Sequence, residues 1–193
     1  MRDPSLRRKI ASLNSLGPFH LIRRESERQE NTYWDTPDLR LRRARAALKV
    51  RRVGSRTEMT FKKEISYRRG ISDRIEVTGP MEPLRRARRI IGNRTLKEVL
   101  TLRTFRRKRI FSFGRQRIEL DLDRVVVQRG GKPVAIHQEV ELENLSASKV
   151  LFREALGALR RQFGRGLCPS RVPKYERGLR LLKKMEPIRA AGV

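Results

Sequence analysis

Apolar and polar residues alternate along most of this chain with a period of two, which is the spacing of a half-buried β-strand. Glycine-containing pairs that favour turns, such as Gly79-Pro80 and Gly114-Arg115, separate the alternating segments. Because most of these segments follow one another closely, we expect a largely antiparallel sheet. Strands are predicted over residues 31–35, 46–53, 58–64, 72–78, 101–113, 116–127 and 134–143.

Three segments carry helical spacing instead. The first is predicted over residues 5–16, with Gly17-Pro18 as its stop signal. The second lies between residues 81 and 100. Together with the strands, these helices predict an α+β fold in which helices flank the sheet. The third helix is predicted from a cap at Ser146 to about residue 163, and its apolar positions share one face: Val150, Leu151, Ala155, Leu156 and Leu159.

Chain length and charge bound the domain organisation and the kind of partner. We expect one domain over residues 1–193, with its core at about 20–180 and a C-terminal tail at 185–193. Lysine and arginine number 48 against 21 acidic residues, so the formal net charge is +27. This charge indicates nucleic acid, an acidic membrane surface or a small polyanion as partner. Arginine suits phosphate oxygens, although an arginine bias of the source genome would raise the total as well.

Few residues are available for zinc or disulfide chemistry. Cys168 is the only cysteine, and His20 and His137 match no metal-ligand spacing, so an internal disulfide and a cysteine-based zinc site are excluded. No apolar run approaches the roughly 20 residues of a membrane span, and the N-terminal segment lacks a signal-peptide core. The sequence therefore predicts a cytoplasmic protein with no membrane partner.

Acidic residues gather on single faces of two predicted strands. In residues 118–123 every second side chain is a carboxylate, and residues 139–143 repeat this pattern. A solvated face would explain one such strand. Like charges adjacent on a sheet destabilise it, however, and a hard divalent cation such as Mg²⁺ or Mn²⁺ would remove that cost. The carboxylates concerned are Glu119, Asp121, Asp123, Glu139, Glu141 and Glu143.

Other strands carry the opposite charge on one face. Each basic pair taken alone is typical of a wet surface. If the sheet closed, its basic and acidic faces would line a wet lumen. A polyphosphate with bound metal would satisfy both signs, because bases contact phosphate oxygens and acids hold the metal. The basic positions are Lys49, Arg51, Lys62, Arg74, Arg106 and Lys108.

Several motifs resemble, in the same order, those of the CYTH domain family of triphosphate tunnel metalloenzymes. They include the family's tyrosine-rich turn, its Thr-x-Lys and Arg-x-Glu strands, its acidic strands and its closing signature. The resemblance spans about residues 30–180. The matching segments are 33–38 (YWDTPD), 47–51 (ALKVR), 59–62 (MTFK), 74–76 (RIE), 118–123 (IELDLD), 139–143 (EVELE) and 173–178 (PKYERG).

The resemblance implies a tunnel of about eight antiparallel strands and a metal-dependent activity. It would assign phosphate binding to Lys49, Arg51, Lys62, Arg74, Arg106, Lys108 and Lys174. It would assign metal binding to Glu119, Asp123, Glu139 and Glu141, with Glu139, Glu141 and Lys174 as the catalytic residues. Asp121 and Glu143 match positions that are not always acidic in the family.

The chain departs from the family pattern near its beginning. The family's first strand carries a Glu-x-Glu-x-Lys motif, and none stands ahead of the predicted helix at 5–16. The nearest sequence, Glu25-Ser26-Glu27, lies too close to Tyr33 to be that strand. Either the sequence starts late or the protein lacks this strand. Without the strand, we expect an open sheet edge and a metal site with two fewer carboxylates. In the closing signature, Pro173 stands where many relatives have Ser.

Three functions are consistent with these patterns. The first is an Mg²⁺- or Mn²⁺-dependent triphosphatase acting on inorganic triphosphate or an organic or nucleoside triphosphate. The second is a non-catalytic module that binds polyphosphate or another polyanion, and the third is an enzyme like the class IV adenylate cyclases. Nucleic acid is a further candidate partner for the basic surface, although two acidic strand faces would repel a duplex. The protein is expected to be a monomer or a homodimer.

Overall fold

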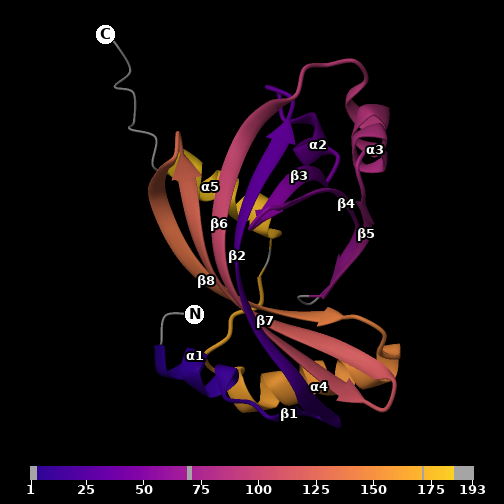
Figure 1. The fold of residues 1–193 in the computed structure, drawn as a ribbon, viewed down its shortest axis with the longest axis vertical. Coiled ribbons are helices and arrows are strands. Elements are labelled where there is room, and N and C mark those ends of the chain that lie inside the picture. The colour runs from indigo at the N-terminus through magenta and orange to yellow at the C-terminus, as the bar shows by residue number, and fades with distance from the viewer. Residues whose placement is uncertain (1–3, 69–70, 171, 185–193) are drawn as a thin grey trace. The chain divides into compact units, whose positions relative to one another are not determined.

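The computed structural model describes residues 4–68, 71–170 and 172–184, so the expected tail at 185–193 lies outside the described residues. Runs of consecutive strands are separated by helices in an α+β arrangement, as predicted (Figure 1). No helix in the described part of the chain is both long and apolar enough to cross a membrane. The elements are α1 (Pro4–Ala11), β1 (Ser15–Leu16), β2 (Phe19–Asp35), α2 (Arg40–Arg43), β3 (Ala46–Val53), β4 (Arg56–Arg68), β5 (Ile71–Thr78), α3 (Glu82–Ile91), β6 (Lys97–Phe113), β7 (Gln116–Arg129), β8 (Lys132–Asn144), α4 (Lys149–Phe163) and α5 (Lys174–Lys184).

All eight strands belong to one sheet. Its hydrogen-bonded order is β5-β4-β3-β2-β6-β7-β8, and the short β1 pairs with β2. The pairs from β1–β2 to β4–β5 are antiparallel, which matches the predicted sheet type. Their register places Tyr33 opposite Lys49, and Lys62 opposite Glu76. In this order β5 and β8 each have one neighbour among the described strands.

The chain divides into two compact units, each assembled from three separate segments. Unit 1 comprises residues 1–28, 104–125 and 137–168, and unit 2 comprises residues 29–103, 126–136 and 169–193. The strands β2, β6, β7 and β8 contribute residues to both units. Each unit has its own hydrophobic core and its own cluster of charged side chains.

The core of unit 1 forms where α1 and α4 pack on the apolar face of its strands. Ile10 of α1 and Ala155 of α4 are fully buried in one cluster with Leu120 and Leu122 of β7. Alternation along β7 leaves its carboxylates on the opposite face, so helix packing on one side fixes where the acids point. Gly17, at a φ of 60°, brings its backbone within van der Waals reach of Ala155.

The core of unit 2 forms between the helices α2 and α3 and the strands β3 and β4. Leu41 and Ile91, from the two helices, are buried with Leu48 and Phe61 of the strands. Trp34 is partly buried and packs against this cluster. Because Leu48 and Phe61 face the helices, their neighbours in sequence turn to the other face of the strands.

Four local predictions are corrected by the structure. The first helix ends at Ala11 instead of residue 16, and the strand predicted from residue 31 begins at Phe19. The cap of α4 is Ser148, whose hydroxyl accepts a hydrogen bond from the Leu151 amide, and not Ser146. On α4, Val150 is 73% exposed instead of buried. Other predictions hold closely, because β3 has the expected bounds and Gly54 and Gly114 adopt positive φ angles in tight turns.

Candidate metal centre and cationic cluster

The carboxylates of β7 are buried although they face away from the apolar core. Asp121 and Asp123 are fully buried, and Glu119 is 8% exposed. On the neighbouring strand β8, Glu139, Glu141 and Glu143 are half-buried. Burying carboxylates is costly unless cations or hydrogen bonds compensate them. This face of unit 1 therefore needs bound positive charge.

The acidic side chains of β7 and β8 form two groups of three. Glu119, Asp121 and Glu143 each place a carboxylate oxygen within 4.8 Å of the others. Asp123, Glu139 and Glu141 do the same. Hard oxygen ligands at such separations suit Mg²⁺ or Mn²⁺. The structure therefore brings together all six carboxylates that the sequence singled out.

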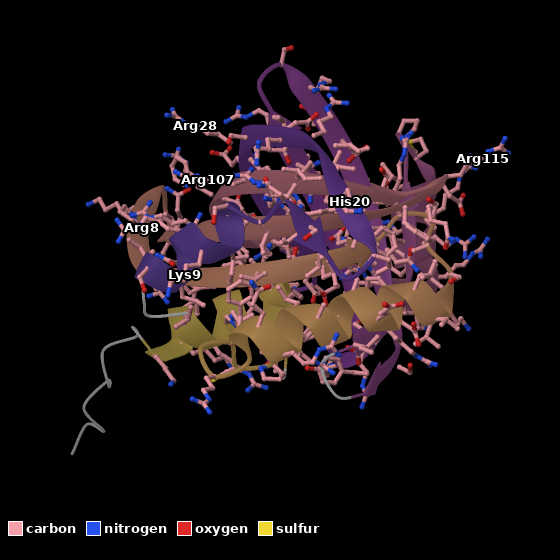
Figure 2. The ribbon with its side chains drawn as sticks, turned by 90° about the horizontal axis from the view of Figure 1, so that it is seen from below. Arg8, Lys9, His20, Arg28, Arg107 and Arg115 are labelled. Carbon is pink, nitrogen blue, oxygen red and sulfur yellow. The ribbon has the colours of Figure 1, made fainter. Side chains whose placement is uncertain are left out.

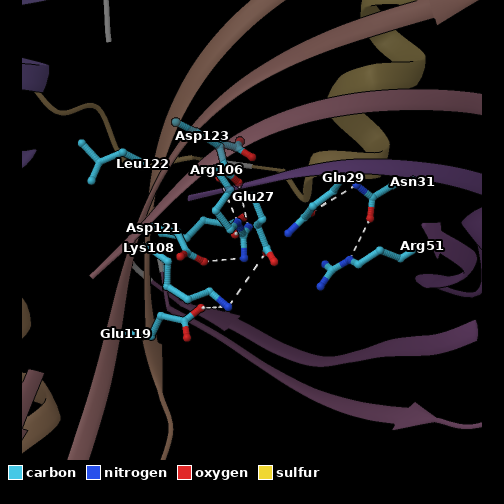
Figure 3. Close-up of polar contacts among 12 residues, drawn as sticks. Glu27, Gln29, Asn31, Arg51, Arg106, Lys108, Glu119, Asp121, Leu122 and Asp123 are labelled. Atoms are coloured by element: carbon cyan, nitrogen blue, oxygen red, sulfur yellow. Dashed lines mark hydrogen bonds and ion pairs between the residues drawn. The ribbon is translucent and has the colours of Figure 1, made fainter. Parts of the chain in front are cut away.

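Arg106 of β6 joins the two groups. Its guanidinium forms ion pairs with Asp121 of the first group and with Asp123 and Glu141 of the second (Figure 3). Two parallel hydrogen bonds, at 2.9 and 2.7 Å, connect it to Asp123, and a third, at 2.9 Å, reaches Glu141. The side chain is 5% exposed, so it is a fixed internal cation. A metal ion would share these carboxylates with Arg106.

Lys108 compensates carboxylate charge at the other end of the same face. Its Nζ lies 3.4 Å from Glu119 and 3.9 Å from Glu27 of β2 (Figure 3). Arg106 and Lys108 are two residues apart on one strand, so they project from the same face. Both were predicted as phosphate ligands, and in the structure both lie among carboxylates.

The donor set of unit 1 fits a divalent cation. Neither carboxylate oxygen of Asp121 accepts a hydrogen bond from the described residues, although Oδ2 lies against the Arg106 guanidinium. Burial raises the pKa of Asp121 to about 9, opposed by Arg106 and reinforced by Glu119 and Asp123. A buried carboxylate with unfilled acceptor positions and acidic neighbours is what a hard cation would relieve.

Two residues of this face were not predicted as site residues. His137 precedes Glu139 on the same face of β8, with its Nε2 3.7 Å from the Glu139 carboxylate. The alternation of β8 could have indicated it, since it extends the acidic face by one position. Glu27 was set aside as too close to Tyr33, yet both residues lie in the single long strand β2. Its two-residue spacing from Glu25 was the available signal.

The predicted cations outside β6 gather in unit 2. Lys49 of β3 is 4% exposed. The pKa of Lys49 lies well below its usual range, mainly because the side chain is buried. The nearby charges of Lys62, Arg51 and Lys174 lower this pKa further, and the charge of Glu76 raises it. Four of the predicted phosphate ligands therefore lie close enough to influence one another. A site of concentrated positive charge favours a polyanionic ligand.

Hydrogen bonds orient the side chains around this cationic cluster. Arg51 donates from Nε to Asn31 at 3.0 Å, and Asn31 donates to Gln29 at 3.3 Å (Figure 3). Lys62 pairs with Glu76 at 2.7 Å, and Arg74 approaches the same carboxylate at 3.4 Å. One glutamate thus holds two of the predicted phosphate ligands in place. The predicted phosphate ligands that lie in unit 2 are Lys49, Arg51, Lys62, Arg74 and Lys174.

The YWDTPD and PKYERG segments have a structural role in unit 2. Asp35 accepts hydrogen bonds from the amides of Thr36 and Leu41 and from the Tyr175 hydroxyl at 3.1 Å. The rings of Tyr33 and Tyr175 stack with their centroids 4.9 Å apart. Burial and the Asp35 charge raise the pKa of Tyr175 above its usual range. These contacts fix the start of α5, and with it Lys174.

Arg42 and Glu176 complete this anchor. The guanidinium of Arg42 donates two hydrogen bonds to the Glu176 carboxylate, at 2.5 and 2.8 Å. The hydrogen bonds from Arg42 lower the pKa of Glu176 to about 2 against the opposing effect of burial. Bidentate pairs of this kind are strong and directional. The pair secures the first turn of α5 against α2.

Comparisons with known proteins agree with this fold. A candidate adenylyl cyclase from Hippeastrum, described as having a dominant triphosphatase activity, shares 19% identity over 93% of this chain and 91% of its own, with a TM-score of 0.68. A candidate adenylate cyclase from Bacillus halodurans shares 18% over 92% of each chain, with a TM-score of 0.55. A protein from Pyrococcus horikoshii shares 21% over 94% of each, also with a TM-score of 0.55. A comparison with curated proteins gave no match.

A family model gives the same assignment by sequence. The CYTH domain model matches residues 11–164 of the 193-residue chain. This range contains both acidic groups and every cation discussed above except Lys174, which lies in the PKYERG segment beyond it. The solved structures with the same fold reach further, covering nine-tenths or more of the chain. The chain belongs to the CYTH domain family.

Proposed function

We propose that this protein hydrolyses a triphosphate with the help of Mg²⁺ or Mn²⁺. The observation that carries the proposal is the pair of carboxylate groups on β7 and β8, each with three oxygens within 4.8 Å of one another. Buried acids gathered in this number, in a protein of net charge +27, have a cost that cation binding would relieve. Membership of the CYTH family supports the same reaction class.

The carboxylates would hold the metal. Asp123, Glu139 and Glu141 form one candidate site, and Glu119 with Asp121 and Glu143 forms a second. A bound divalent cation would supply a Lewis acid and neutralise charge on phosphate oxygens. Glu139 and Glu141 are more exposed than the buried aspartates, so a carboxylate oxygen of either could accept a hydrogen bond from the attacking water.

The cations would bind and orient the phosphates. Lys49, Arg51, Lys62, Arg74 and Lys174 offer a concentrated set of donors in unit 2. Arg106 and Lys108, the other two predicted phosphate ligands, pair with carboxylates within unit 1. Phosphoryl transfer depends mainly on positioning and on electrostatic stabilisation, and these side chains supply both. Lys174 would act from the first residue of α5, which Asp35 and Arg42 anchor through Tyr175 and Glu176.

Hydrolysis is favoured over the two alternatives. The description of the Hippeastrum protein names triphosphatase activity as dominant in that protein, and we extend the activity to this chain as a proposal. A cyclase would need a pocket for the base, and no residues of this chain have been assigned to one. A binding module without turnover would need the cations but not the two acidic groups. A cytoplasmic location and a monomeric or homodimeric state stay predictions.

The test is phosphate release from inorganic triphosphate and from ATP with Mg²⁺ or Mn²⁺, with cyclic AMP measured in parallel. The Glu139→Gln/Glu141→Gln variant should lose turnover, while the control Glu58→Gln/Glu154→Gln, which changes two exposed carboxylates, should retain it. Phosphate release that survives in the first variant would reject the assigned carboxylates. Binding of triphosphate with no turnover in the unmodified protein would favour the binding module, and cyclic AMP as the main product would favour the cyclase.

A further inference from the structure

A second charged feature of unit 1 lies on the opposite side of β6 from the carboxylates. Phe105 is 38% exposed, and two guanidinium groups lie over its ring. Arg28 of β2 is 5.6 Å from the ring centroid, and Arg124 of β7 is 5.7 Å from it. Because successive residues of a strand face opposite ways, Phe105 and Arg106 point to different sides of the sheet. This feature is therefore separate from the candidate metal centre.

Further exposed arginines lie on the same strands as Arg28 and Phe105. Arg24 of β2 and Arg107 of β6 are exposed, as are Arg28 and Arg124. Arg107 and Arg124 help to lower the pKa of Arg7, after burial as the main cause. Arg24 and Arg107 likewise help to lower the pKa of Arg109, and burial is again the main cause. We refer to the exposed group Arg24, Arg28, Arg107 and Arg124, with Phe105, as the outer arginine patch.

The patch lacks compensating negative charge. Among the described residues, none of its four arginines forms an ion pair with a carboxylate, and Arg24 instead donates to the Asn14 side chain at 2.7 Å. Arg8 and Lys9 of α1 lie toward the same end of the molecule as Arg28 and Arg107 in Figure 2, while Arg115 lies toward the other end. Exposed like charges kept this close favour an anionic partner.

We propose that the outer arginine patch binds single-stranded nucleic acid. Guanidinium groups pair with the phosphodiester oxygens in a fork geometry and also present flat faces on which unpaired bases stack. In the patch, the ring of Phe105 holds two of these planes in place. The acidic faces of β7 and β8 do not oppose this binding, since they lie on the other side of the strands.

An anionic membrane fits the same patch less well. Stable membrane binding by a basic surface helix needs an apolar face for insertion. The apolar residues of α1 are committed to the core, with Leu6 9% and Ile10 0% exposed. The patch itself offers one partly exposed ring, over which two guanidinium groups lie. Its chemistry is therefore that of phosphate recognition and stacking.

The test is fluorescence anisotropy with a fluorescein-labelled 12-nucleotide RNA of mixed sequence over a series of salt concentrations. The patch variant is Arg28→Gln/Arg107→Gln/Arg124→Gln, and the control Arg115→Gln/Arg153→Gln/Arg165→Gln removes the same charge from exposed positions elsewhere in unit 1. The patch variant should bind about tenfold more weakly or worse, and its slope of log affinity against log salt should fall by roughly 2, the share of three phosphate contacts.

The outcomes separate the possible partners. The control variant should keep RNA affinity near that of the unmodified protein, and phosphate release from triphosphate should be unchanged in both variants. Equal loss of RNA binding in the two variants would overturn the proposal, because it would indicate a response to total charge. Loss of binding to phosphatidylserine vesicles with RNA binding retained in the patch variant would overturn it in favour of a membrane. Thermal unfolding of both variants checks that the fold is intact.

Discussion

Arg106 donates from Nε to one carboxylate oxygen of Asp123 at 2.9 Å and from Nη2 to the other at 2.7 Å. Burial alone would lower the pKa of Arg106, but its hydrogen bonds to Asp123 and the charges of Asp121, Asp123 and Glu141 raise it above the usual value. Arg106 therefore stays charged and shares its carboxylates with any metal that enters. Metal binding and the stability of unit 1 should depend on the same residue.

Replacing Arg106 by Gln should destabilise the metal-free protein and enlarge the effect of metal. Removing one partner of a buried ion pair costs about 3–5 kcal/mol, because the remaining charges are left uncompensated. Mn²⁺ would then compensate Asp121, Asp123 and Glu141, so it should raise the melting temperature of the variant more than that of the unmodified protein. Differential scanning fluorimetry with EDTA and with Mn²⁺ measures this.

The control for that experiment is Arg103→Gln, which removes an arginine whose side chain is 57% exposed and which pairs with Glu30. An exposed pair of this kind contributes about 0–1 kcal/mol. The control should match the unmodified protein with and without Mn²⁺. An equal rise in melting temperature for the unmodified protein and Arg106→Gln would contradict a shared role for the carboxylates.

Binding of inorganic triphosphate should be accompanied by proton uptake at Lys49. The pKa of Lys49 lies well below its usual range, mainly through burial and then through Lys62, Arg51 and Lys174. A nearby polyanion opposes this shift and raises the pKa again, so binding should be accompanied by proton uptake at a pH between the two pKa values. Isothermal titration calorimetry at pH 8 without metal, in buffers of different ionisation enthalpy, gives the number of protons.

Two variants assign the proton to this residue. Lys49→Met should abolish the uptake, while Arg74→Gln, which removes a permanently charged side chain, should weaken binding and leave the uptake in place. Uptake unchanged in Lys49→Met would assign the proton to another group and remove Lys49 from the proposed phosphate site.

The anchor between Arg42 and Glu176 should stabilise the protein in a pH-dependent way. The pKa of Glu176 falls from its ordinary 4.5 to about 2, first through hydrogen bonds from Arg42. Because the folded pKa lies below the unfolded value, the contribution is complete above about pH 4.5 and is lost as the pH falls toward 2. Glu176→Gln should lower the free energy of unfolding at pH 7 by about 2 kcal/mol.

Urea unfolding at pH 7, 4 and 2.5 checks this window. The difference between Glu176→Gln and the unmodified protein should shrink at the two lower pH values. The exposed control Glu58→Gln should differ little at any of them. A difference that stays constant down to pH 2.5 would show that the charge of Glu176 is not its source.

Gly178→Ala should loosen the packing of α5 on β6. A Cβ at this position would lie 2.6 Å from a methyl carbon of Leu100 and 3.2 Å from one of Leu102. Leu100 and Leu102 are 2% and 0% exposed, so they have little room to move. Overpacking costs about 1–3 kcal/mol, and the better helix propensity of Ala returns up to about 1 kcal/mol, so net destabilisation is expected.

Gly157→Ala in α4 provides the matched comparison. Its Cβ would approach only the end of the flexible Arg161 side chain, at 3.3 Å. The gain in helix propensity should therefore dominate and raise the melting temperature. If both substitutions stabilised the protein equally, Gly178 would not be a close-packing position.

The sequence predicts that acidic and apolar side chains lie on opposite faces of β7, because strand alternation is local. Once residues 116–127 form a strand, the acids at 119, 121 and 123 must share one face. The bounds of β3 and the turns at Gly54 and Gly114 follow from equally local preferences. The family motifs allowed residues on several strands to be predicted as parts of one site.

The start of β2 could not be predicted in the same way. Residues 23–30 are almost entirely polar, which gives little β-propensity and no alternation of apolar side chains. The pairing of β2 with β3 begins only at Glu30, and the other neighbour of β2 in the sheet is β6, which lies much later in the chain. The pairing brings Glu27 to Lys108, a contact between residues that local patterns do not connect.

The sequence by itself determined which residues are acidic or basic on each strand face, because side-chain direction follows from a two-residue repeat of the backbone. Only the tertiary structure decided which strands are neighbours, and hence that Arg106 pairs with Asp121, Asp123 and Glu141 and that Arg28 and Arg124 meet over Phe105. Those partners depend on sheet order, which long-range hydrogen bonding and core packing select.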